Sequence, residues 1–568
     1  MSAENPEEPG VAHSLQPSPC EGEGDKIPPP SARLRQGGRA GTDTAQVARA
    51  AGLVMALFVV SRALGLVREM VIGHQFGTSG TLDAYLAAFR LPDILFQIVA
   101  GGALASAFIP TFATFWERDD RAGAWRLASA VINLVLAITV ALAAASALLA
   151  PWLVRVVIAP GFDAERQALA AGLMRLMLVT PAVFGVSGVI MGILNARQHF
   201  FLPAVAPVLY NLGIIGGALL LAPSMDVRGL AVGVVAGSLG HLLVQLPALA
   251  RQGMRYAPAL GLRDAGVREV GRLMLPRMLG LAAVQLNFLV NTILASGLAA
   301  GSLSALNYAW LLMLLPQGVF AQAVATAAFP TFSAQVARGA LHEMRAMLAT
   351  TLRAVLYLAL PATVGLMLLR TPLVQVIFQR GAFTQGSTGM VAGALALYAI
   401  GLPAHSAVEI LVRAFYAMHD TRTPVAVGVA AMGLNVGLSL ALLGAFESAG
   451  KPPYGGLALA NSLATMAEMG ALLGVLRRRL GGLEERRLAS SLARVGLASA
   501  AMAAVLLAVS WALAGASAWL QAGVGIAAGV ATYAGASLAL GATEPRAMIG
   551  AMRRRGGAGT RSRGDTPR

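Results

Sequence analysis

Long apolar stretches recur along almost the whole chain, and this feature most constrains the fold. Fourteen segments follow one another, each near the 20 or so apolar residues that a helix needs to cross a bilayer. They lie near 50–72, 81–108, 128–150, 168–195, 202–222, 229–250, 272–296, 303–328, 350–369, 389–416, 424–446, 455–476, 489–514 and 517–541. Only 12% of the residues are charged, against roughly 25% in soluble domains. The sequence predicts an all-α polytopic membrane protein with fourteen transmembrane helices and excludes a β-barrel.

Basic residues alternate between the connections of these segments. One set of connections and the two tails carry arginine clusters such as Arg477 to Arg479, whereas the other set carries few basic residues: Arg155, Arg166, Arg228, Arg370, Arg380 and Lys451. Because Lys- and Arg-rich loops stay in the cytoplasm, both termini are predicted to be cytoplasmic. The net charge of +16 then fits cytoplasmic loops and anionic headgroups, and we expect no nucleic-acid partner.

The sequence repeats itself at a spacing of about 220 residues. Residues 107–112, Ala-Phe-Ile-Pro-Thr-Phe, match residues 327–332, Ala-Ala-Phe-Pro-Thr-Phe. Pro181 matches Pro403, and residues 80–84 match 301–305. Because the repeat contains six segments, an even number, its two copies keep one orientation and predict two parallel six-helix lobes. We expect a disordered tail at residues 1–47, a first lobe at 48–250 and a second lobe at 251–480. Two extra helices at 481–543 and a basic tail at 544–568 would follow.

Charged residues inside the apolar segments are the strongest candidates for a binding site. A charge at bilayer depth costs roughly 2.5 to 3.5 kcal/mol on insertion scales, so such residues normally line a cavity. The candidates are Arg62, Arg68, Glu69, Asp83, Arg90 and Arg277. Because arginine binds phosphate oxygens bidentately and stays charged, this pattern favours an anionic, phosphate-bearing substrate. A structural alternative pairs Arg62 or Arg68 with Asp83 as an intramembrane ion pair.

Other features of the apolar segments favour structural roles. Glu409 and Arg413 stand four residues apart in the order that stabilises a helix, which predicts a local pair. The glycine-rich stretches 185–192 and 213–217 predict close helix packing. Arg277 has no acidic neighbour in the sequence.

Signatures of enzymes and of metal sites are missing from the sequence. It has no P-loop and no Gly-x-Ser-x-Gly elbow. The seven histidines are scattered, so we expect no metal site. The sequence therefore predicts neither an enzyme nor a resident cofactor.

Residues 61–69, Ser-Arg-Ala-Leu-Gly-Leu-Val-Arg-Glu, resemble a motif of the MurJ (MviN) lipid II flippases, which belong to the multidrug/oligosaccharidyl-lipid/polysaccharide exporter superfamily. Further stretches resemble the same family: Phe76-Gly77, Asp83-Ala84, 89–92, Gly102-Ala103, 107–110, Asn291-Thr292, 414–417 and 420–424. The resemblance covers about residues 48 to 540 and includes the count of fourteen segments.

The resemblance implies two six-helix lobes in a V-shaped arrangement, alternating access, and a groove for the polyprenyl tail built with helices thirteen and fourteen. Lipid II would move from the cytoplasmic to the periplasmic leaflet of the inner membrane. Ser61, Arg62, Arg68 and Asp83 occupy positions that the family uses in its central cavity, and Glu69 stands where an acidic residue follows the second arginine. Arg62 and Arg68 would hold the lipid-linked pyrophosphate, with Asp83 orienting them.

The expected partners are a lipid-linked glycan, membrane lipids and cell-wall synthesis proteins. A coupling ion such as Na⁺ or H⁺, or the membrane potential, would drive transport.

Some polar positions of the family's cavity differ in this chain. Phe96 and Gln97 stand where the family has an arginine, Gly101 where it has an acid, and Leu311 where it has another arginine. Arg277 could supply a replacement cation. These departures leave two alternatives: an exporter of another lipid-linked oligosaccharide or of drugs, and a non-transporting paralogue that acts as an envelope scaffold.

Overall fold

The computed structural model of the chain describes residues 40–99 and 102–542, and within these ranges it contains helices and connections but no strand. It divides into two compact units, Met1–Leu53 and Val54–Arg568. The described part of the first unit is the start of helix α1, Ala40–Phe76, so residues 40–47 of the predicted disordered tail are helical. Residues 1–39 and the predicted tail 544–568 lie outside the described residues.

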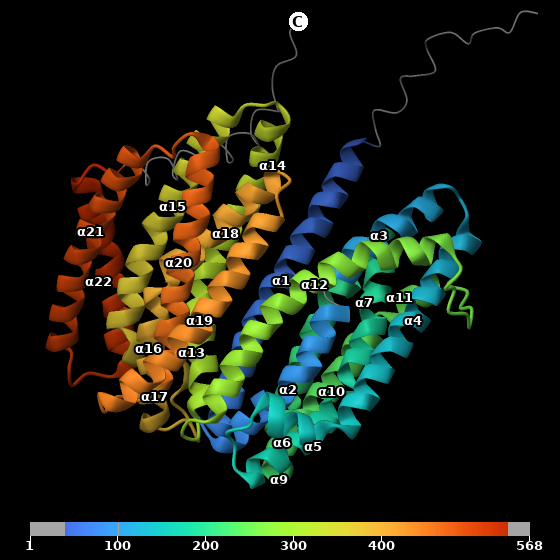
Figure 1. Ribbon diagram of the computed structural model, residues 1–568, viewed down its shortest axis with the longest axis horizontal. Coiled ribbons are helices and arrows are strands. Elements are labelled where there is room, and N and C mark those ends of the chain that lie inside the picture. The colour runs from blue at the N-terminus through green and yellow to red at the C-terminus, as the bar shows by residue number, and fades with distance from the viewer. Residues whose placement is uncertain (1–39, 100–101, 543–568) are drawn as a thin grey trace, which may run out of the picture. The chain divides into compact units, whose positions relative to one another are not determined.

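Residues 54–250, the first half of the second unit, continue α1 and form ten further α-helices and two π-helical turns (Figure 1). They are α2 Gly80–Val99, α3 Gly102–Glu117, α4 Arg121–Leu148, α5 Ala150–Leu153, η2 Val154–Ile158, α6 Ala164–Met177, α7 Thr180–Ala196, α8 Phe201–Gly216, η3 Gly217–Leu221, α9 Ala222–Met225, α10 Val227–Leu243 and α11 Leu246–Arg251. Asp120 caps α4 and Asp163 caps α6 through their side chains, which explains where these helices begin.

Residues 251–480, the second half, and the two helices that follow complete the described chain. The elements are α12 Ala265–Ser296, α13 Ser302–Gln317, η4 Gly318–Gln322, α14 Ala323–Ala337, α15 Leu341–Leu368, α16 Arg370–Phe378, α17 Gln385–Ile400, α18 Leu402–Ala417, α19 Arg422–Ser448, α20 Tyr454–Leu480, α21 Glu485–Ala512 and α22 Ala518–Ala539. The repeated prolines Pro181 and Pro403 stand in the first turns of α7 and α18, where the missing N–H of proline costs little.

Each predicted apolar segment coincides with one helix or with a run of consecutive helices. In the described residues, ten helices are long and apolar enough to cross a membrane, or eleven if α17 and α18, bent by 47°, form one span. The count of fourteen is thus not confirmed by apolarity alone. The remaining segments correspond to α1, α2 with α3, and α12, and both α1 and α2 contain the charges singled out above.

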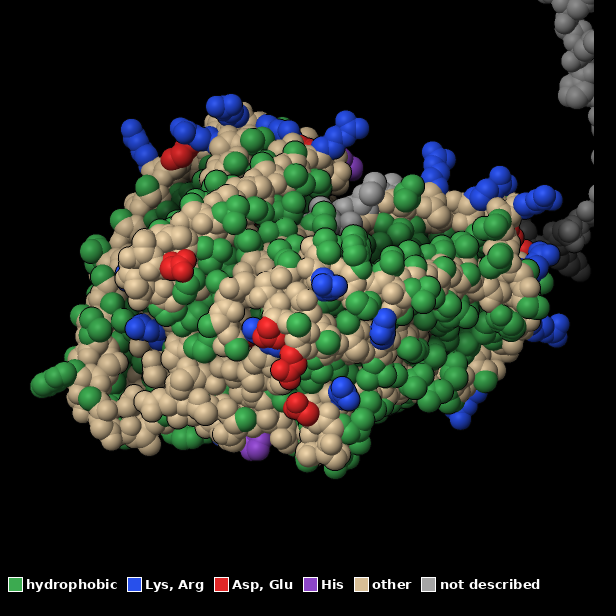
Figure 2. Space-filling model, turned by 60° about the horizontal axis from the view of Figure 1, so that its bottom comes forward, with side chains coloured by type: hydrophobic (Ala, Val, Ile, Leu, Met, Phe, Trp, Pro, Cys, Tyr) green, Lys and Arg blue, Asp and Glu red, His purple; other side chains and the backbone are tan. Residues whose placement is uncertain are grey.

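The surface of the second unit is apolar over wide areas, and Figure 2 shows Lys and Arg side chains gathered along one rim beside it. Large side chains such as Leu148, Leu220 and Trp511 are 81%, 78% and 85% exposed. Soluble monomers rarely expose apolar patches of this extent. Such a surface suits contact with lipid, as the apolar sequence predicts.

Glycines let α8 and η3 pack directly on α10. A Cβ on Gly213 would lie 2.3 Å from Cα of Gly237, and a Cβ on Gly217 would lie 2.6 Å from Cα of Gly233. The predicted close packing by the stretch 213–217 is therefore confirmed. Small residues at this spacing let two membrane helices approach to backbone contact.

Helix α12 belongs to the second half in sequence but packs largely on the first. It contacts α2 and α3, and Val267 and Val270 belong to a buried cluster with Phe112 and Leu127 of the first half. The predicted boundary at residue 250 therefore follows the repeat, whereas packing joins α12 to helices before that boundary. The V-shaped arrangement of the lobes stays a prediction.

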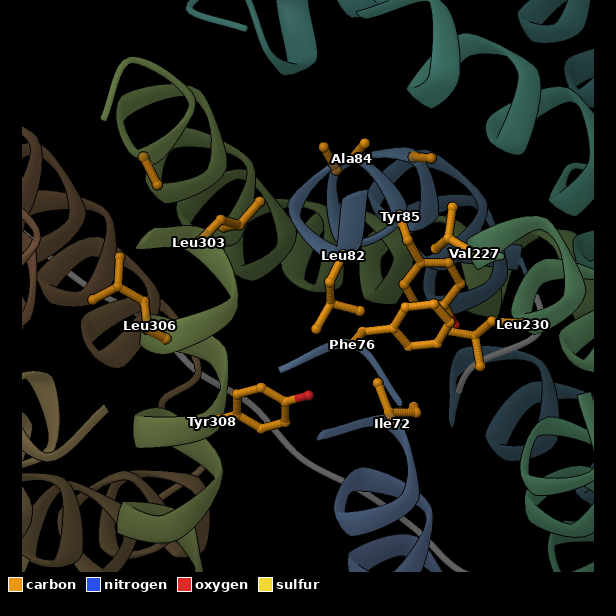
Figure 3. Packing of buried hydrophobic residues seen from close by; sticks show 14 of the residues in the cluster. Ile72, Phe76, Leu82, Ala84, Tyr85, Val227, Leu230, Leu303, Leu306 and Tyr308 are labelled. Carbon is orange, nitrogen blue, oxygen red and sulfur yellow. The ribbon is translucent and has the colours of Figure 1, made fainter. Parts of the chain in front are cut away.

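The largest buried cluster joins both halves. Figure 3 shows Ile72 and Phe76 of α1 and Leu82 of α2 beside Leu303 and Tyr308 of α13, with the Tyr308 ring pointing toward the end of α1. Burial of this cluster attaches α13 to the helices that carry most of the candidate residues.

Candidate functional site

Arg68 on α1 lies at the centre of a hydrogen-bonded group. Its Nη2 and Nε donate to Oε1 of Glu69 at 2.7 and 3.1 Å, and its Nη1 donates to Oδ1 of Asn211 on α8 at 3.1 Å. These bonds engage three N–H groups of a guanidinium that has five, so within the described residues two donors are left for a ligand. The side chain of Arg68 is 27% exposed and that of Glu69 is 12% exposed, so the pair is only partly desolvated.

Asn211 holds Arg68 in place and is itself held. Its Nδ2 donates to the carbonyl of Pro207 at 3.0 Å and to the carbonyl of Ser61 at 3.4 Å. Ser61, a predicted site residue, thus enters the site through its backbone. Asn211 was not among the predicted site residues; a neutral polar residue in an apolar segment was the available signal.

Two cavities meet at Arg68. The smaller, about 150 Å³, is lined by Arg68 and Glu69 together with Tyr85, Asn307 and Tyr308. The Tyr308 hydroxyl is buried and has no hydrogen-bond partner among the described residues. A buried hydroxyl without a partner costs free energy, so this one is available to a bound group.

The larger cavity, about 360 Å³, lies in the first half and has an aromatic wall. Its lining includes Arg68, Asp93, Phe96, Phe184 and His241. Phe96, which stands where the family has an arginine, therefore faces this cavity. His241, like Phe184, was not among the predicted site residues.

Arg90 joins the two halves instead of lining either cavity. Its Nε donates to Oγ1 of Thr292 on α12 at 3.1 Å, and its guanidinium lies 5.6 Å from the ring centroid of Phe288. One turn along α2, Oδ2 of Asp93 accepts from Nε2 of Gln285 at 3.2 Å. These contacts fix α12 against α2.

Asp83 has a different partner from the one expected. Its carboxylate is 2% exposed, and its two oxygens accept from the backbone N–H groups of Gly301 at 2.7 Å and Ser304 at 2.8 Å. No ion pair between Asp83 and Arg62 or Arg68 is present in the described part of the chain. The carboxylate instead satisfies the free amides at the start of α13, as an N-cap does.

The contacts around Asp83 form a seam between the halves, and the repeat is visible in it. Gly77, at φ +57°, is so close to the second half that a Cβ would lie 2.3 Å from the carbonyl oxygen of Ala382. The corresponding contact of the repeat joins Gly161 and Gly297: a Cβ on Gly161 would lie 2.4 Å from Cα of Gly297. These two contacts bring the backbones of the two halves together directly.

Arg62 lines neither of the two cavities. Arg62 is exposed, and its guanidinium lies 5.3 Å from the ring centroid of Phe58. Arg277 lies on α12, but its side chain and Gly101 lie outside the described residues. Arg413 forms its predicted local ion pair with Glu409.

Comparison with known proteins gives one consistent family. The family model described as lipid II flippase MurJ matches residues 72–522. The lipid II flippase MurJ of Burkholderia cenocepacia is 34% identical over 389 residues, which are 67% of this chain and 75% of that protein. The probable lipid II flippase MurJ of Vibrio cholerae is 31% identical over 511 residues, 86% of this chain and 95% of that protein.

Solved structures show the same fold. A lipid II flippase MurJ in an inward closed conformation has a TM-score of 0.73 at 24% identity and covers 88% of this chain and 99% of its own. An inward-facing multidrug resistance MATE family transporter of the MOP superfamily has a TM-score of 0.62 at 16% identity, covering 76% and 98%.

Proposed function

The chain belongs to the MurJ lipid II flippase family, and we propose from this premise that it moves lipid II across the bacterial inner membrane. The family expected from the sequence is confirmed by the match of the family model over residues 72–522. The chain is accordingly a multi-pass inner-membrane transporter and not an enzyme. The lipid-linked headgroup would pass through the protein while its tail remains among membrane lipids.

This proposal rests on how the guanidinium of Arg68 is held in the structure. Glu69 and Asn211 fix its guanidinium, and two of its N–H donors remain free beside two cavities. A fixed planar fork matches the oxygens of a pyrophosphate, and the unpartnered Tyr308 hydroxyl in the smaller cavity adds a further donor. We assign the pyrophosphate of lipid II to Arg68, with Glu69 and Asn211 as positioning residues.

Transport requires that the seam at Asp83 opens and closes. With the seam closed, the site communicates with one side of the membrane, which we assign to the cytoplasm; opening it would release the headgroup to the periplasm. Binding of Na⁺ or H⁺, or the membrane potential, would bias the two states. One charge moved through 100 mV is worth about 2.3 kcal/mol, which is a bias of about fiftyfold.

The remaining candidates take supporting roles in this proposal. Arg62, which is exposed and seven residues before Glu69, would attract the anionic headgroup. Arg90 would hold α12 against α2 through Thr292, and Arg277 would contribute a cation from the second half. Cytoplasmic termini and cell-wall synthesis proteins as partners complete the proposal.

The test is complementation in a bacterium depleted of its own lipid II flippase, with growth and lipid II exposure at the outer leaflet as readouts. The parent chain should rescue both. Arg68→Ala should lower lipid II exposure at least about tenfold, since each charge-assisted hydrogen bond contributes about 1.5 to 3 kcal/mol. Arg68→Lys should rescue in part, because lysine retains charge but lacks the fork.

Arg175→Ala is the matched control, because Arg175 also lies in a membrane helix but donates to the carbonyl of Ala147, away from both cavities. It should rescue like the parent. Full rescue by Arg68→Ala at normal membrane levels would overturn the proposal.

A further inference from the structure

We propose that the larger cavity, of about 360 Å³, is a subsite for the sugar ring that adjoins the pyrophosphate of a lipid-linked glycan. This inference rests on the proposed function, because it takes Arg68 as the pyrophosphate contact. It assigns a binding site to the sugar, the part of the substrate that Arg68 does not contact.

Aromatic rings from three helices form one wall of this cavity. The ring centroids of Phe96 on α2 and Phe184 on α7 are 4.9 Å apart, and that of Tyr210 on α8 lies 5.0 Å from Phe184 with its ring edge-on. A pyranose ring has apolar C–H faces and a rim of hydroxyls. The negative face of an aromatic ring attracts such C–H groups, so a rigid aromatic wall suits a sugar better than a flexible chain.

Polar groups on the cavity wall match the hydroxyl rim. Asp93 already accepts from Gln285 at 3.2 Å, but a carboxylate has about four acceptor sites and retains capacity for sugar hydroxyls. A cavity lined mainly by apolar side chains with a few placed polar groups is the usual form of a small-molecule site.

His241 adds a further polar group to the cavity wall. Its Nδ1 lies 2.7 Å from Oγ of Ser187, which also accepts from Nε2 of Gln245 at 2.7 Å. Within the described residues its Nε2 has no hydrogen-bond partner, and a ring nitrogen can pair with a sugar hydroxyl as donor or as acceptor. His241 thus offers the sugar a second polar contact besides Asp93.

Size and position agree with one sugar. The volume of about 360 Å³ is near the lower end of the roughly 300 to 1,000 Å³ typical of ligand pockets, which suits a single ring and not a whole disaccharide-peptide. Arg68 lines both cavities, so a pyrophosphate held there delivers its first sugar directly into the larger one.

The test measures binding of two probes to the purified full chain in lipid nanodiscs: lipid II, and undecaprenyl pyrophosphate, which lacks the sugar. The parent should bind lipid II more tightly. Phe96→Leu should weaken lipid II binding between about twofold and about tenfold, the range of one aromatic contact, and leave undecaprenyl pyrophosphate binding unchanged. Arg68→Ala should weaken both. Phe184→Leu provides a second variant if Phe96→Leu fails to fold.

Phe201→Leu is the matched control, because Phe201 is 51% exposed and lies outside both cavities; it should bind both probes like the parent. If Phe96→Leu and Phe184→Leu leave lipid II binding unchanged, or weaken both probes equally, the sugar subsite is refuted while the assignment of Arg68 stands. If the parent binds neither probe, the proposed function itself fails.

Discussion

Asp83→Ala offers the sharpest test of how the halves are held together. In the folded protein this buried carboxylate accepts from two amides at the start of α13, Gly301 and Ser304, at 2.7 and 2.8 Å. Alanine leaves both N–H groups buried without a partner while changing little else at the seam. The substitution should therefore weaken the closed seam more than it weakens either half.

The magnitude follows from the two lost hydrogen bonds. Each buried amide left unpaired costs about 1 to 3 kcal/mol, which sums to about 2 to 6 kcal/mol for Asp83→Ala. A loss of about 3 kcal/mol shifts an equilibrium between closed and open seams by about 150-fold. Asp83→Asn retains one acceptor oxygen and should have about half this effect.

The assay is the alkylation rate of a cysteine placed in the seam. Ser387→Cys is suitable, because Ser387 is 6% exposed and its Oγ lies 2.8 Å from Oγ1 of Thr78 across the seam. The background is Cys20→Ser, which removes the only native cysteine. With the purified chain in nanodiscs, the introduced thiol should react slowly when Asp83 is present and much faster with Asp83→Ala.

Glu117→Ala serves as the control, since Glu117 is an exposed acidic residue of the first half at the end of α3. It should leave the alkylation rate unchanged. If a folded Asp83→Ala protein reacts no faster than the parent, the carboxylate does not hold the seam and the argument from its hydrogen bonds is wrong.

Two further predictions concern packing and pH. Gly217→Ala should destabilise the protein by about 1 to 3 kcal/mol through overpacking, because the added Cβ would lie 2.6 Å from Cα of Gly233. Gly216→Ala, which has open space around the added Cβ, should not destabilise it. Thermal unfolding of the two variants compares them. Hydrogen bonds from the hydroxyl and amide of Thr423 and from Arg479 lower the pKa of Asp420, in the loop before α19, to about 2. This depressed pKa stabilises the fold above about pH 4, so the melting-temperature advantage of the parent over Asp420→Asn should be largest near pH 6 and shrink as the pH falls toward 2.

Much of the architecture was predictable from local signals. Apolar runs of spanning length mark helices whatever their neighbours are, since lipid forces backbone hydrogen bonds inside the segment. Proline and capping residues mark helix starts, as Pro181 and Asp163 do. Arg68 and Glu69 were identifiable because a charge in an apolar segment is costly wherever the helix packs.

The partners of these charges were not predictable. Asp83 contacts backbone more than 200 positions away, and backbone amides leave no trace in a sequence pattern. Arg62 and Arg68 lie on one helix, yet only Arg68 lines a cavity, because α8 brings Asn211 to that side of α1. Periodicity relates residues within a helix but not the rotation of one helix against another.

The sequence by itself determined the membrane class, the helices, the internal repeat and the family, because each depends on composition or local spacing. Only the tertiary structure decided that Asp83 caps α13, that α12 packs on the first half, and that Phe96, Phe184 and His241 surround one cavity. Those outcomes depend on side-chain packing between distant helices, and many packings of equally apolar helices satisfy the same sequence pattern.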